Sequence, residues 1–88
     1  MTPRPSTQAE HLAAAEHHRA MAKAATVPAE RHAHQAARRA HAQAAKDPSN
    51  AALAEEARQY SLDANEESQL VRRYARILRH TVARRARR

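Results

Sequence analysis

One stretch, residues 49–88, constrains the fold more than any other because it contains neither proline nor glycine. Its seam positions alternate in steps of four and three, the spacing that keeps one helix face against a partner. The seam consists of Leu53, Ala57, Tyr60, Ala64, Glu67, Val71, Tyr74, Leu78 and Thr81. At about 1.5 Å per residue, a helix over this stretch would be roughly 60 Å long. The sequence therefore predicts one long C-terminal helix.

The middle of this stretch is its weakest part. Poor helix formers gather there: Ser61, Asp63, Asn65 and Ser68. Asp63 with Glu66 also fits a cap that would begin a new helix at this point. The seam keeps its phase across the interruption, which favours a continuous helix, but a break between residues 61 and 68 is the alternative.

Two shorter helices are predicted before residue 49. Thr7 and Glu10 fit a capping box, so the first helix should run from about residue 9 to residue 25. Pro28 disfavours a helical Val27 yet suits the first turn of a second helix over residues 29–46. Asp47 and Pro48 are expected to separate the second helix from the third in the same way, with Asp47 as the N-cap of the third helix. Similar lengths and a tight turn predict an antiparallel αα-hairpin.

Composition sets the fold class. With no glycine and 24 alanines, the chain favours an all-α fold, a hairpin plus one long C-terminal helix in a three-helix arrangement. There is no Phe or Trp, and a buried CH₂ contributes only about 0.8 kcal/mol, so an alanine-lined core stabilises little. We therefore expect an oligomeric helical bundle or a partner-stabilised fold. Three segments are predicted: a disordered arm over residues 1–6, an alanine-rich hairpin with the first half of the third helix over 7–67, and a basic amphipathic helix and tail over 68–88.

The net charge of +7 is concentrated at the C-terminal end. Residues 1–71 hold eight Lys and Arg against nine Asp and Glu, whereas no acid follows Glu67. The candidate polyanion-binding residues are Arg72, Arg73, Arg76, Arg79, Arg84, Arg85, Arg87 and Arg88. Guanidinium groups match phosphate oxygens bidentately, which predicts binding of nucleic acid or another polyanion. The alternatives are a solvated face, an acidic protein groove, and an anionic membrane surface, which the lack of Trp and Phe disfavours.

The same helix carries an apolar stripe opposite most of its arginines when residues 70–88 are projected at 100° per residue. The predicted interface residues are Leu53, Tyr60, Leu70, Val71, Tyr74, Ile77, Leu78 and Val82. They predict a homo-oligomer or a partner protein. The alternative function is accordingly a protein-interaction or adaptor module whose amphipathic helix docks into a partner's groove.

Seven histidines raise the question of a metal site. In a hairpin that turns near Val27, His18 should approach His34 and His11 should approach His41. However, no helix contains an H-x-x-x-H or E-x-x-H pair that would form a site on one face. We expect no metal and no cofactor, and instead a stripe of surface histidines that changes charge near pH 6.5.

Several classes are not expected. Without cysteine there are no disulfides, no thiolate catalysis and no Cys-type zinc sites. No Gly-rich loop or nucleophile elbow is present, and a small core should leave little scope to shift a pKa by burial, so we expect no enzyme. The N-terminal residues lack the apolar region of a signal peptide, and no apolar run approaches a membrane span. A cytoplasmic or nucleic-acid-associated protein is predicted.

Overall fold

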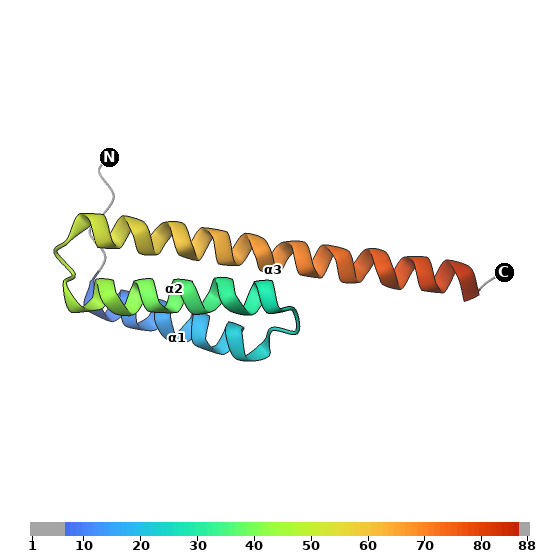
Figure 1. Ribbon diagram of the computed structural model, residues 1–88, viewed down its shortest axis with the longest axis horizontal. Helices are drawn as coiled ribbons and strands as arrows, with labels where there is room; N and C mark the ends of the chain where they lie inside the picture. Colours follow the sequence, from blue (N-terminus) through green and yellow to red (C-terminus); the bar gives the residue numbers. More distant parts are fainter. Residues whose placement is uncertain (1–6, 87–88) are drawn as a thin grey trace.

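The computed structural model describes residues 7–86 and contains three helices and no strand over that range. They are α1 (Gln8–Ala24), α2 (Pro28–Lys46) and α3 (Ala51–Ala86). Figure 1 shows α1 and α2 as a hairpin, with α3 running alongside α2 and then extending past it. This confirms the all-α class and the hairpin followed by a long helix. The arm predicted over residues 1–6, and Arg87 and Arg88, lie outside the described residues.

Helix α3 is continuous through the doubtful middle segment. It spans 36 residues, which corresponds to about 54 Å of helix. The prediction of continuity is confirmed, and the alternative of a second helix beginning near Asp63 is wrong.

The predicted start signals hold for two helices and fail for the third. Thr7 Oγ1 accepts the Glu10 N–H at 3.1 Å, and Pro28 is the first residue of α2. The cap of α3 is Asn50 rather than Asp47: Asn50 Oδ1 accepts the N–H of the second and third helical residues at 3.1 and 3.2 Å. Asp47 instead accepts the Asn50 side-chain N–H at 3.3 Å within the connecting turn, so Pro48 belongs to that turn and not to the helix.

Helix α2 lies at the centre, since both α1 and α3 pack against it. Every buried apolar residue described is an alanine: Ala22, Ala25, Ala37, Ala44, Ala45, Ala57 and Ala64. Alanine allows helix backbones to approach closely but buries little apolar area per residue. The rest of the described interior is polar, as the next subsection shows.

The residues of α3 that are buried agree with the predicted seam at some positions and differ from it at others. Ala57 and Ala64 are buried, as predicted. Tyr60 is 41% exposed, however, while its neighbour Ser61 is half-buried and Ser68 is buried. The sequence pattern predicted that Tyr60 lies at the interface. Ser61 lies there instead, because closely spaced helices accommodate its smaller side chain.

Beyond Val71, α3 extends past the start of α2, and Thr26 and Val27 of the α1–α2 turn lie beside the first residues of this extension. All residues from 72 to 86 are exposed. We call this segment, residues 72–86, the overhang. None of the described helices combines the length and apolar content needed to cross a membrane.

Candidate functional site

A polar cluster occupies the interior between the three helices. Two side chains from each helix form it: His11 and His18, His34 and His41, and Ser61 and Ser68. The members of each pair are seven residues apart, so they lie on one face of their helix two turns apart. We call these six residues together with Glu30 the histidine–serine network.

The histidines meet in two pairs across the α1–α2 interface. The Nδ1 atoms of His11 and His41 lie 2.9 Å apart, and those of His18 and His34 lie 2.8 Å apart. Both distances are typical of a hydrogen bond between a ring N–H and a ring lone pair. The two predicted pairings are therefore confirmed, because the antiparallel hairpin places these positions opposite each other.

The serines of α3 connect the two pairs and extend the network. Ser61 Oγ lies 2.8 Å from His18 Nε2 and 2.6 Å from His41 Nε2, so it bridges one ring of each pair. Ser68 Oγ lies 2.6 Å from His34 Nε2 and donates to Glu30 Oε1 at 3.3 Å. The network thus runs without a gap from His11 to Glu30.

These histidines are buried, which overturns the prediction of a surface stripe. His34 is fully buried, and His11 and His18 are each 2% exposed. Only His17, His32 and His80 are exposed. The physical reason is that the core holds no large aliphatic side chain, so imidazole rings fill the volume that alanines leave. Hydrogen bonds to serines and to one another offset much of the cost of burying the ring nitrogens.

Burial keeps several of these rings neutral. It is the main cause that lowers the pKa of His18 from 6.5 to about 4, and neighbouring positive charge adds to the effect, in order from His34, His17 and His41. Burial likewise lowers the pKa of His34, more than the nearby Glu30 carboxylate raises it. The pKa of His41 is lowered by burial and then by His11. The expectation that the core is too small to shift a pKa is therefore wrong.

Sequence reasoning missed three members of the network. Ser61 and Ser68 were interpreted as poor helix formers in the weakest part of the helix, and Glu30 was not singled out. The available signal was the shared spacing of seven: two histidines on each hairpin helix and two serines on α3. Within residues 7–86, no group of three His, Asp or Glu side chains is arranged to hold a metal ion.

The predicted polyanion-binding arginines lie on the overhang. Those that the structure describes are Arg72, Arg73, Arg76, Arg79, Arg84 and Arg85, all exposed. Because no acid follows Glu67 in the chain, their positive charge is not balanced within the overhang. Arg85 falls on the side of the apolar stripe at 100° per residue, whereas Arg72, Arg76 and Arg79 lie opposite it.

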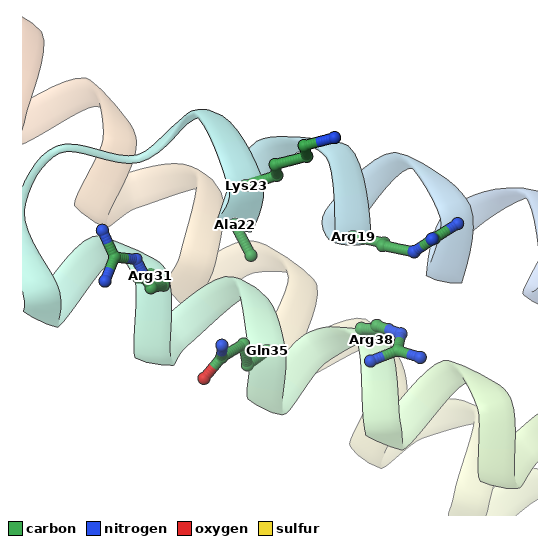
Figure 2. Close-up of a pocket in the computed structure, with 6 residues that line it drawn as sticks. All are labelled: Arg19, Ala22, Lys23, Arg31, Gln35 and Arg38. Carbon is green, nitrogen blue, oxygen red and sulfur yellow. The ribbon is translucent and has the colours of Figure 1, made fainter.

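A second basic surface, which the sequence did not single out, lies on the hairpin. A hollow of about 250 Å³ lies between α1 and α2. Figure 2 shows the side chains that line it. Its lining residues are Arg19, Ala22, Lys23, Arg31, Gln35 and Arg38. The Arg31 guanidinium donates to the Ala25 carbonyl at 3.1 Å, which links the start of α2 to the end of α1. No acid lines this hollow.

The predicted interface residues are divided among three regions. A groove of about 440 Å³ forms where the α1–α2 turn meets α3. It is lined by Thr26, Val27, Glu67, Leu70, Val71, Tyr74, Ala75 and Leu78. Four predicted interface residues therefore share this groove. Ile77 and Val82 are exposed elsewhere on the overhang. Leu53 is half-buried and Tyr60 is exposed near the start of α3.

Comparisons with known proteins add no functional information for this chain. No protein-family model matches its sequence, and neither a curated protein nor a solved structure matches it. A proposed function therefore rests on the charge, burial and hydrogen bonding described above.

Proposed function

We propose that this protein is a small helical binding protein that holds nucleic acid or another polyanion on the arginine-rich face of α3. The observation that carries the proposal is the overhang: a helical segment in which every residue is exposed, rich in arginine, in a part of the chain that contains no acid. Guanidinium groups bind phosphate oxygens through paired hydrogen bonds, and each phosphate neutralised releases counterions.

The spacing of three arginines supports a contact with successive phosphates. Arg72, Arg76 and Arg79 lie on one side of α3 and extend over about 10 Å along its axis. The apolar stripe, which includes Tyr74 and Leu78, lies on the other side. The two faces can therefore bind different partners, and substitutions can test them separately.

Replacing Arg72, Arg76 and Arg79 with Gln is expected to weaken binding to DNA and RNA. Binding weakens linearly with the logarithm of salt concentration, with a slope of about −0.9 per phosphate contacted, so the slope should fall in magnitude by roughly 2–3. Gln forms helices nearly as well as Arg, so circular dichroism should remain unchanged. Fluorescence anisotropy with a labelled oligonucleotide over a range of salt concentrations measures both affinity and slope.

A matched control removes the same charge from the hairpin. Arg19, Arg38 and Arg39 are exposed, and their replacement with Gln should leave the salt slope close to that of the unchanged protein. Equal losses in the two triple variants would show diffuse attraction to a cationic protein rather than a site on α3. Unchanged affinity and slope in the Arg72 triple variant would contradict the proposal.

A second function is favoured by the apolar groove at the α1–α2 turn. Leu70, Tyr74 and Leu78 are 41%, 66% and 62% exposed, which leaves a contiguous apolar surface uncovered. We infer that a second copy of the chain covers it, because each copy supplies both a groove and an overhang with a matching apolar stripe. An antiparallel pairing of two α3 helices would keep Arg72 and Arg76 on the outer faces, where a polyanion can reach them.

Changing Leu78 to Glu is expected to convert this oligomer to a monomer. A carboxylate in the centre of the apolar contact is desolvated without a partner, which costs more than the contact gains. Sedimentation velocity at tens of micromolar measures the change. Leu62 is also exposed on α3 but does not line the groove, so Leu62→Glu should leave the oligomer intact. A monomer in the unchanged protein would rule out self-association and leave a different partner protein as the occupant.

A further inference from the structure

The hydrogen bonds of the histidine–serine network can be assigned a direction from one end. Ser68 Oγ donates its only proton to the Glu30 carboxylate. Its 2.6 Å contact with His34 Nε2 must therefore be accepted by the serine oxygen, so His34 carries its proton on Nε2. A neutral imidazole has one N–H, which leaves His34 Nδ1 as a lone-pair acceptor.

The same rule fixes the next ring and the bridging serine. Because His34 Nδ1 accepts, the proton in the 2.8 Å contact belongs to His18 Nδ1. His18 Nε2 is then unprotonated and must accept the proton of Ser61 Oγ at 2.8 Å. The Ser61 hydroxyl has no second proton, so in its other contact it can only accept.

The final steps lead to His11. Since Ser61 accepts, His41 donates from Nε2 at 2.6 Å, and its Nδ1 is unprotonated. His11 therefore donates from Nδ1 across the 2.9 Å contact. This leaves His11 Nε2 as a lone pair with nothing to accept.

The hydrogen-bonded chain ends at this ring nitrogen. Among the described residues, His11 Nε2 is the only buried side-chain nitrogen or oxygen without a hydrogen-bond partner. It is the one atom that the directional assignment leaves unused. A buried acceptor without a partner costs about 1–3 kcal/mol.

We propose that the histidine–serine network is a proton relay, in which a proton taken up at His11 Nε2 is delivered as a proton on the Glu30 carboxylate. Each group accepts one proton on one side and passes one on from the other. The order is His11 to His41, then Ser61, His18, His34, Ser68 and Glu30. In one transfer seven N–H or O–H bonds form, including the bond to the incoming proton, and six break. No group is oxidised or reduced. Every hydrogen bond in the network reverses its direction.

The relay accounts for how a core without large apolar side chains accepts a proton. After one transfer every imidazole is again neutral, with its N–H on the other nitrogen, and Glu30 has lost its charge. The interior therefore gains no imidazolium ion. The low pKa of His18 and the lowered pKa values of His34 and His41 are consistent with rings that pass protons on rather than hold them.

Few other titratable groups act on the network. From α1, His17 lies with its ring centroid 5.3 Å from that of His18, and its charge opposes protonation of His18 and His34. From α2, Glu30 is the acidic terminus. From α3, the hydrogen-bonding members Ser61 and Ser68 are uncharged, so the direction of the relay is set by Glu30 at one end and the free lone pair at the other.

Nitrogen NMR of the full chain tests the relay, because long-range proton–nitrogen correlations show which ring nitrogen carries the proton. At neutral pH we expect Nδ1–H on His11 and His18, and Nε2–H on His34 and His41. On mild acidification, while circular dichroism shows the helices intact, all four rings should exchange tautomer at one midpoint. The Glu30 carboxyl carbon should report its protonation at the same midpoint.

Three results would overturn the proposal. The first is Nε2–H on all four rings, which would turn paired Nδ1 lone pairs toward each other and indicate a metal-type arrangement. The second is formation of an imidazolium within the network while Glu30 stays ionised. The third is separate midpoints for the His11–His41 pair and the His18–His34 pair.

A serine variant tests whether the two halves communicate. Ser61→Ala removes the bridging hydroxyl, so His18, His34 and Glu30 should still change together while His11 and His41 no longer follow them. Ser61→Thr keeps the hydroxyl and should restore a single midpoint. If Ser61→Ala left the common midpoint unchanged, the relay would not pass through Ser61. The tautomer pattern of the unchanged protein decides the proposal even if the alanine variant fails to fold.

Discussion

Acidification from neutral pH to about pH 4 is expected to unfold the helical hairpin. The pKa of His18 is about 4 in the folded protein, against 6.5 for the free side chain, chiefly because of burial and secondarily because of His34. As the pH falls, His18 therefore becomes protonated in the unfolded chain at a higher pH than in the folded protein. The free energy of unfolding stays constant above pH 6.5 and falls as the pH drops toward 4.

The expected loss is large for a protein with an alanine core. Each pH unit of pKa difference corresponds to about 1.4 kcal/mol, so His18 alone removes on the order of 3 kcal/mol by pH 4. The lowered pKa values of His34 and His41 act in the same direction. Urea unfolding followed by far-ultraviolet circular dichroism across this pH range measures the loss. The first proton can enter through the relay without harm, whereas further protons create buried imidazolium ions.

A control variant separates buried from exposed histidines. His32 and His80 are exposed, so replacing both with Gln should leave the acid transition where it is. An unfolding free energy that is constant down to pH 4, or an acid transition that this double variant abolishes, would contradict the assignment to buried rings.

Replacing Ala57 with Leu is expected to destabilise the protein by roughly 1–3 kcal/mol, because a closely packed interface has no space for three added carbons. Ala57 is fully buried on the face of α3 that packs against α2. For a domain of this size the midpoint of thermal unfolding should fall by about 4–8 °C per kcal/mol. Differential scanning calorimetry provides the measurement.

The same substitution at Ala52 serves as its control. Ala52 is exposed near the start of the same helix, and Leu has nearly the helix propensity of Ala. Thermal stability should therefore change little. A rise in stability for Ala57→Leu would instead show that α2 and α3 are held apart by a void that leucine fills.

Much of the fold follows from local sequence signals. The Thr7–Glu10 capping box and the Val27–Pro28 step determine where α1 begins and where α2 replaces it. The absence of proline and glycine after Pro48 determines that α3 is long. The hairpin register, read from the position of the turn, correctly predicts that His11 meets His41 and that His18 meets His34. These features depend on backbone geometry within or between adjacent segments, which sequence spacing describes well.

The tertiary structure alone decided which side chains fill the interior. Hydrophobicity favours Tyr60 at the α3 interface, yet Ser61 lies there, because small side chains let the helices approach and a hydroxyl reaches two ring nitrogens at once. Hydropathy likewise places histidines on the surface. Whether a ring is buried depends on partners from another helix, here Ser61 and Ser68 of α3, that are distant in sequence and individually ordinary. The sequence by itself determined the helices and their pairing; the polar core required the three-dimensional arrangement, because its stability comes from hydrogen bonds shared among three helices.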